Sequence, residues 1–231
     1  SPLLSYSLMI GDILMISGRV PRIIATPLMV HLHGWCGIPF IGPVPYIALL
    51  LRLSRQGQRS FGSRLGRHIM QLSVDFLPNV GGIAAHVYEL ARALRALGND
   101  ITIVTFRDSL FAPGEETIDG LHVVRVYLPR NTVLLYPAFA LFEYFSVRRI
   151  IKRKKIDLLH SHYVFPDGFV SRLQPGVPGI ATEHTSGFLD RLEQGRMLGL
   201  YRWVYSRMNH IITPSDELAG AVGSLGVPRQ K

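Results

Sequence analysis

Residues 74–106, VDFLPNVGGIAAHVYELARALRALGNDITIVTF, contain the pattern that identifies the fold class. An apolar run over residues 67–74 predicts a buried strand, and the turn that contains Gly81-Gly82 breaks it. Apolar side chains then recur at helical spacing from Ile83 to Leu97 and predict an amphipathic helix. β-branched residues from Ile101 to Phe106 predict a second strand. This order of strand, glycine turn, helix and strand is the opening of an α/β sheet domain.

The predicted helix carries one apolar stripe and ends at a glycine. The members of the stripe are Ile83, Val87, Leu90, Ala91, Leu94 and Leu97. Gly98 follows as a stop, because glycine adopts the left-handed conformation without a steric penalty. We expect the stripe to pack against the sheet.

Gly81 and Gly82 precede the first turn of this helix. A helix start leaves N–H groups unpaired and carries partial positive charge. Without Cβ atoms, the two glycines would let a phosphate or a sugar approach the main chain. A tight turn that needs positive φ explains the pair without any ligand. On the glycines alone we prefer that explanation, because the spacing is neither G-x-G-x-x-G nor a P-loop.

The rest of the chain continues the alternation of strands and helices. Strands are predicted at residues 156–161, 179–183 and 210–213, a hairpin at 117–127 around Asp119-Gly120, and helices from Ala138 through a basic run, at 188–208 and after the capping residue Ser215. Asp167-Gly168 is interpreted as the cap of a short helix. The alternation predicts an α/β fold with a doubly wound parallel sheet, Rossmann-like in its topology.

Polar groups follow three of the predicted strands. They are Gly81-Gly82, then His160 and His162 with Tyr163, then Glu183 with His184. Ligands of such sheets bind beyond the carboxyl ends of the strands, so we expect these groups to converge on one site. Each histidine also has a purely structural interpretation. His162 would order its loop, His160 would lie within the strand, and His184 would bond to Glu183 or to the main chain.

The sequence from Arg67 to Lys231 resembles the N-terminal domain of the retaining glycosyltransferases of family 4, which have the GT-B fold. Four motifs carry the resemblance in the family's order: the P-x-x-G-G loop with its helix and following strand (Pro78–Thr105), IDLLHSHYVFPDG (Ile156–Gly168), GIATEHTSG (Gly179–Gly187) and IITPSDELAGAVGSLGVP (Ile211–Pro228).

The resemblance implies transfer of a hexosyl group from a nucleotide sugar to a glycan or a lipid-linked acceptor. It implies that His162 is the catalytic contact and that Gly81, Gly82, Tyr163, Glu183 and His184 bind substrate or phosphate. It also implies that Glu183 is no general base, because a phosphate oxygen of the donor receives the acceptor proton.

In this family the donor-binding residues belong to a C-terminal domain, which residues 67–231 do not contain. We therefore expect this chain alone to bind acceptor weakly and to turn over little or nothing. No D-x-D motif occurs, so the prediction is transfer without a metal and without a cofactor other than the donor.

The composition of the chain limits which disulfides and binding partners it can have. A single cysteine, Cys36, excludes an intrachain disulfide and fits the cytoplasm. The first 66 residues hold six arginines and one acidic residue, so +5 of the net +9 lies outside the matching domain, and we do not predict nucleic-acid binding. A basic run over residues 148–155 is interpreted as a solvated helix end, or as a peripheral contact with anionic lipid at the inner face of the membrane.

Residues 1–66 match nothing in the family. Their apolar runs are short and interrupted, whereas a membrane-spanning helix needs about 20 apolar residues. We interpret the segment as an extension that is not native to the domain; the alternative is a weak membrane-associating extension.

Two other functions compete with transfer of a sugar. One is a GT-B-fold sugar epimerase, and the other is a non-catalytic sugar-binding or interaction module. A dinucleotide dehydrogenase is disfavoured, since its glycine fingerprint and acidic partner are missing from the sequence.

Overall fold

The structure is a computed structural model that describes residues 66–79, 81–107, 109, 111, 113–127, 135–184 and 186–227. Residues 1–65, which hold nearly all of the predicted extension, and Val80 of the glycine loop lie outside the described residues. The elements are β1 (His68–Leu72), α3 (Gly82–Ala96), β2 (Asp100–Arg107), β3 (Glu115–Ile118), β4 (Leu121–Tyr127), α4 (Leu135–Arg153), β5 (Leu158–Ser161), the π-helical turn η1 (Val164–Gly168), α5 (Phe169–Arg172), β6 (Gly179–Thr182), α6 (Ser186–Glu193), α7 (Leu198–Arg207), β7 (His210–Ile212) and α8 (Asp216–Ser224).

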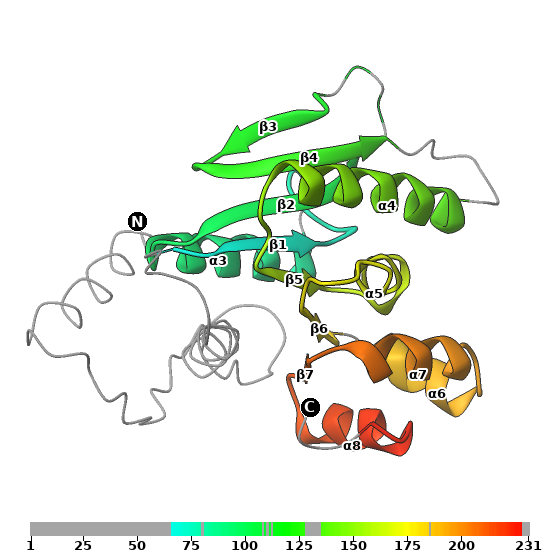
Figure 1. The fold of residues 1–231 in the computed structure, drawn as a ribbon. Helices are drawn as coiled ribbons and strands as arrows, with labels where there is room; N and C mark the ends of the chain where they lie inside the picture. The colour runs from blue at the N-terminus through cyan, green and yellow to red at the C-terminus, as the bar shows by residue number, and fades with distance from the viewer. Residues whose placement is uncertain are drawn as a thin grey trace, which may run out of the picture. The chain divides into compact units, whose positions relative to one another are not determined.

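The strands form one 7-stranded sheet in the order β3-β4-β2-β1-β5-β6-β7 (Figure 1). All neighbours pair in parallel except β3, which pairs antiparallel with β4. Apart from the edge strand β3, the chain builds outward from β1 in one direction through β2 and β4, and then in the other through β5, β6 and β7. This is the order of a doubly wound sheet, and the direction reverses between β1 and β5.

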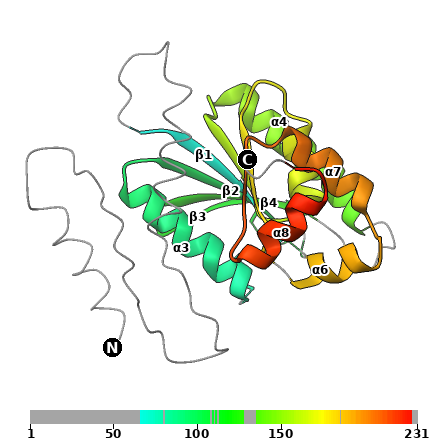
Figure 2. The same ribbon diagram turned by 90° about the horizontal axis from the view of Figure 1, so that it is seen from below.

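The two faces of the sheet are covered by different helices. One core contains α3, whose Val87 and Leu94 pack with strand residues such as Ile69. The other contains α4 and the short α5, with Phe139 and Val170 packed with Met70 and its face neighbours. Figure 2 shows α3 and α4 on opposite sides of the strands. Successive β1 residues alternate between these cores, as the two-fold period of a strand requires.

The C-terminal helices form a third core. Phe188 of α6, Tyr205 of α7 and Leu218 of α8 are buried together. Ser215 caps α8, as predicted, because its Oγ accepts a hydrogen bond from the N–H of Leu218 at 3.2 Å. None of the helices within the described ranges is long and apolar enough to cross a membrane.

The hairpin prediction is confirmed. Asp119 and Gly120 have φ of 49° and 76°, so both occupy the left-handed region that a two-residue hairpin turn requires. Two helix predictions are wrong in detail. The helix expected over residues 188–208 is divided into α6 and α7, since Gly195 and Met197 also have positive φ. Leu97 is the C-cap of α3 and is 42% exposed, so it lies outside the buried stripe.

The contrast between Leu94 and Leu97 gives a matched test of the core. We expect Leu94→Ala to lower the free energy of unfolding by about 3 kcal/mol, because the side chain is fully buried. Leu97→Ala should cost less than about 1 kcal/mol, since much of that side chain already contacts water. Urea denaturation of both variants measures the difference; equal losses would contradict this packing.

Candidate active site at the carboxyl ends of the strands

The loops after β1 and β5 diverge at the point where the strand order reverses. Main-chain hydrogen bonds extend the sheet into both loops. The N–H of Ser73 donates to the carbonyl of Val104, and the N–H of His162 donates to the carbonyl of Leu72, each at 3.0 Å. His162 is therefore held beside β1 by its own backbone. A switch point of this kind is where open α/β sheets bind ligands.

Three imidazoles from three elements meet at this edge. His162 follows β5, His184 follows β6, and His86 comes from the second turn of α3. Nδ1 of His162 and Nε2 of His184 share a hydrogen bond of 3.0 Å, in which one nitrogen donates and the other accepts. The ring of His86 lies edge-on to both, with centroids 4.8 Å from His184 and 5.9 Å from His162. The residues that follow β5 and β6 therefore converge, as predicted, and His86 of α3 joins them.

Burial keeps these imidazoles neutral. It lowers the pKa of His184 to about 3, and His86 adds to the effect. It also lowers the pKa of His162 well below its usual value, helped by the neighbouring histidines, and lowers that of His86. A neutral imidazole offers one N–H donor and one acceptor, so the cluster can hydrogen-bond to hydroxyl groups but supplies no positive charge. Nε2 of His162 is buried with no hydrogen-bond partner among the described residues.

The same three rings have the composition of a metal site. One ring nitrogen from each lies within 4.8 Å of the others. Tetrahedral zinc at about 2.0–2.1 Å from each nitrogen brings its ligands to about 3.3 Å from one another. The His162–His184 pair is already close enough, whereas coordination by all three nitrogens requires the wider pairs to close in.

The glycine loop begins α3 without a side-chain cap. Gly81 is the N-cap with φ of −160°, and neither glycine has positive φ. The explanation of the pair as a turn that needs positive φ is therefore wrong. A Cβ at either position would meet no atom of the described residues within 4 Å, so that part of the chain leaves the space in front of them open. No acidic residue occupies the first turn, and the helix presents its partial positive end to this space.

Two long-range hydrogen bonds fix the loop after β1. The hydroxyl of Tyr163 donates to Oδ2 of Asp75, which ties the loop after β5 to the loop after β1. The guanidinium of Arg125, from β4, donates to the carbonyl of Leu77 and to the carboxylate of Glu116. Tyr163, predicted to bind substrate, is thus engaged with Asp75 in this structure.

Other predicted residues point into the fold. Glu183 accepts a hydrogen bond of 2.7 Å from the hydroxyl of Tyr205, which directs its carboxylate toward α7. His160 is fully buried within the sheet, with Nε2 2.8 Å from Oγ1 of Thr182 on β6. Asp167 caps no helix: the N-cap of α5 is Gly168, without a side-chain cap, and Asp167 is fully buried inside η1.

Three side chains at or behind the site were not predicted from the sequence. His86 could have been found by its position four residues after Gly82 at the start of the helix. Asp75 could have been found as a polar residue just past the end of β1. Glu143 gives no such signal. Burial raises its pKa well above the usual range, as does the nearby Asp167, whose own pKa burial raises too.

Comparisons with known proteins agree with this geometry. The model of glycosyltransferase family 4 matches residues 80–231. The gpi3 subunit of phosphatidylinositol N-acetylglucosaminyltransferase from Schizosaccharomyces pombe is 28% identical over 61% of this chain and 32% of its own length. An uncharacterized glycosyltransferase from Methanocaldococcus jannaschii is 29% identical over 58% of this chain and 36% of its own. The chain thus spans about a third of the length of these relatives.

The fold recurs in solved structures. A sucrose-phosphate synthase from Thermosynechococcus elongatus superposes with a TM-score of 0.52 at 19% identity, over 63% of this chain and 41% of that chain. The sheet and its helices are therefore those of a GT-B glycosyltransferase, which confirms the predicted fold class.

The buried histidines predict a specific pH dependence of stability. The unfolded chain protonates His184 near its ordinary pKa of 6.5, but the folded chain does so only near about 3. The stability that depends on neutral His184 is complete above pH 6.5 and is lost as the pH falls, at about 1.4 kcal/mol per pH unit.

Denaturant unfolding at a series of pH values from about 7 to about 4 measures this slope. In His184→Gln the slope near pH 5 should be shallower by about 1.4 kcal/mol per pH unit. Identical slopes in the variant and the unchanged chain would show that His184 titrates normally in the folded state.

Proposed function

Because the chain belongs to glycosyltransferase family 4, we propose that the loops at this sheet edge form the acceptor-side wall of a sugar-transfer site. The donor is a nucleotide sugar, a hexosyl group is transferred, and transfer retains the anomeric configuration. The observation that carries the proposal is the meeting of His86, His162 and His184 beside the uncapped start of α3. Hydrogen-bonding groups and a helix N-terminus are what a sugar and a diphosphate need.

The chemistry divides between these groups. Sugar transfer passes through an oxocarbenium-like state while the leaving diphosphate gains negative charge. The N–H groups in the first turn of α3, which Gly81 and Gly82 begin, stabilise part of that charge. His162, as catalytic contact, and His184 hydrogen-bond to sugar hydroxyls near the reacting carbon. A base with a pKa of about 3, like His184, is too weak to remove the acceptor proton efficiently at neutral pH. The proton therefore passes to a phosphate oxygen of the donor.

The relatives suggest the acceptor. Subunits of phosphatidylinositol N-acetylglucosaminyltransferase from Schizosaccharomyces pombe and Homo sapiens are 28% and 29% identical to this chain over their matched regions. We therefore favour a lipid acceptor over a soluble glycan, with phosphatidylinositol and N-acetylglucosamine as the first pair to test. A lipid acceptor places the reaction at a membrane surface, on the cytoplasmic side.

The test is turnover by the protein that carries this chain, measured as release of nucleoside diphosphate from a panel of nucleotide sugars with phosphatidylinositol vesicles. We expect His162→Ala to lower kcat/KM by about tenfold to a hundredfold, the value of one or two hydrogen bonds to a sugar. The matched control is His122→Ala, which removes an imidazole from the second residue of β4, at the amino end of that strand. Equal activity of the two variants would show that His162 has no catalytic role.

Other outcomes decide between functions. Conversion of the nucleotide sugar into its epimer without acceptor would establish the epimerase. Binding of sugar with no turnover under any combination would establish the non-catalytic module.

Metal removal separates two uses of the three imidazoles. We expect a chelator such as EDTA to leave kcat/KM within about twofold, because the proposed transfer needs only hydrogen bonds and N–H groups from this wall. Loss of activity on chelation, with recovery on addition of Zn²⁺, would instead make His86, His162 and His184 a metal centre.

A further inference from the structure

Helix α4 has an unusual outward surface. Three large apolar side chains are exposed on it: Leu141 is 55% exposed, Phe142 48% and Phe145 60%. Residues 141 and 145 are separated by one helical turn, and 142 lies next to them, so all three share one side of the helix. The inward side of the same helix is filled by Phe139 and Val147, which pack on the sheet. The exposed group is therefore not needed for the core.

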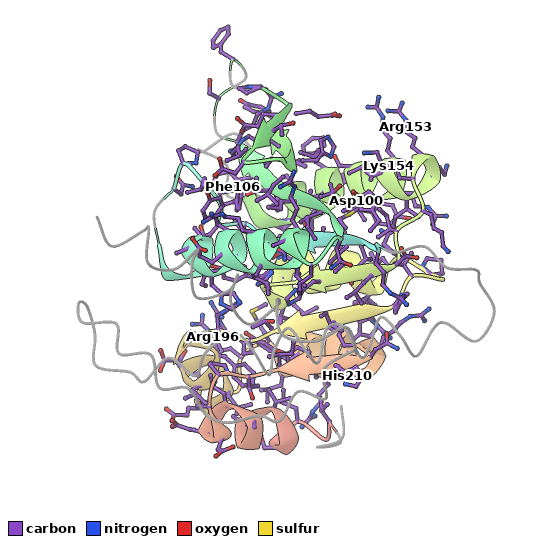
Figure 3. The ribbon with its side chains drawn as sticks, turned by 90° about the vertical axis from the view of Figure 1, so that its left-hand side faces the viewer. Asp100, Phe106, Arg153, Lys154, Arg196 and His210 are labelled. Carbon is purple, nitrogen blue, oxygen red and sulfur yellow. The ribbon has the colours of Figure 1, made fainter. Side chains whose placement is uncertain are left out.

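Basic side chains continue this surface toward the end of the helix. Phe145 and four cations line a shallow hollow of about 280 Å³; the cations are Arg148, Arg149, Lys152 and Arg153. None of the four takes part in an ion pair within the described part of the chain. The one acidic residue of α4, Glu143, is fully buried on the other side. Figure 3 shows Arg153 and Lys154 projecting from the end of this helix.

We propose that this outward face of α4, made of the three exposed apolar residues and the four cations of the hollow, docks on an anionic phospholipid bilayer. The apolar residues enter the boundary between headgroups and acyl chains, and the cations bind the phosphate groups of the lipids. The helix lies on the membrane and does not cross it. This inference deepens the lipid acceptor of the proposed function, but the binding itself requires no sugar transfer.

Charge and apolar surface together select a bilayer as the occupant. A nucleic acid or a soluble polyanion would use the cations and leave Phe142 and Phe145 in water. An apolar protein partner would use the aromatic residues and leave four unpaired cations without a counter-charge. An interfacial helix uses both, since each cation near an anionic surface and each buried aromatic ring adds to binding.

The topology gives the docked helix a direction. Helix α4 leaves the carboxyl end of β4 and returns the chain to the amino end of β5. Its exposed apolar residues therefore lie closer to the strand ends that carry the histidines than its basic end does. A helix docked in this way brings the candidate active site to the side of the apolar contact, where a lipid-linked acceptor is available.

Vesicle binding tests the proposal directly. The 231-residue chain is mixed with vesicles of phosphatidylcholine, with and without phosphatidylserine, and the bound fraction is measured by flotation. We expect binding to the anionic vesicles only, and weaker binding as salt rises from about 0.1 M to about 1 M. Arg149→Gln/Lys152→Gln should lower the affinity about thirtyfold, because each cation contributes about fivefold.

A matched control keeps the net charge equal. Arg196→Gln/Arg202→Gln removes two exposed cations from the region of α6 and α7, which Figure 3 shows apart from the basic end of α4. This variant should bind as the unchanged chain does. If both double variants lose affinity equally, only net charge matters and α4 is not the docking surface. If neither loses affinity, another part of the chain binds the membrane, and the proposal is equally wrong.

The apolar half is tested separately. Phe142→Ser/Phe145→Ser should keep the fold, since both rings are about half exposed, and should lower vesicle affinity by at least about tenfold. Phe145→Trp should show a blue-shifted emission on anionic vesicles, beyond any change in the unchanged chain. A tryptophan that stays in water would overturn insertion. Retention on heparin but not on vesicles would assign the patch to a soluble polyanion and overturn the proposal.

The outcomes also separate this inference from the proposed function. A chain that binds vesicles while the protein that carries it transfers no sugar would retain the docking surface and reject the reaction. Transfer to a soluble acceptor, with no binding to vesicles, would retain the sugar-transfer reaction and reject the docking surface.

Discussion

The reversal of strand order between β1 and β5 is the constraint on which the rest of the structure depends. The connection after β1 crosses one face of the sheet through α3, and the connection after β5 crosses the other through η1 and α5. The two adjacent loops therefore leave this switch point toward opposite faces of the sheet. The main-chain bonds of Ser73 and His162 extend the sheet pairing into both loops. The positions of the imidazoles follow from this arrangement.

The site has two different electrostatic environments, one around the buried histidines and one at the start of α3. The histidines lose their charge because water is excluded around them, so they act as neutral donors and acceptors. The start of α3 carries the partial positive charge, and it is exposed because glycine leaves the space before it open. A sugar and a phosphate need these two environments side by side. Neither environment alone would distinguish this sheet edge from an ordinary buried polar cluster.

Local signals in the sequence predicted most of the fold. Three features depend only on neighbours within a few residues, so the sequence is enough to predict them: the apolar stripe of α3, the Asp119-Gly120 turn and the Ser215 cap. Glu143 could not be predicted, because an acidic residue on an amphipathic helix is expected to face water. The division between α6 and α7 was also hidden, since it depends on Met197 adopting a left-handed conformation that bulky residues rarely use.

The site was predicted less completely than the fold. The order of the motifs identified His162 and His184, but their mutual hydrogen bond and the approach of His86 are tertiary facts. Glu183 shows the limit most clearly, because its neighbour His184 bonds to His162 while its own carboxylate is held by Tyr205. Adjacent residues on an extended chain point in opposite directions, and only the packing decides which one reaches a ligand.

The bond between Nδ1 of His162 and Nε2 of His184 influences which groups can insert between the two rings. One of these nitrogens carries the proton and the other accepts it, because both rings are neutral. A hydroxyl group that inserts can accept from the first ring and donate to the second without any change of tautomer. An ionised carboxylate or phosphate only accepts, so it fits only after the second ring moves its proton to the nitrogen that faces the anion. The pair of rings therefore favours hydroxyl groups over anions without the need for a negatively charged side chain at this position.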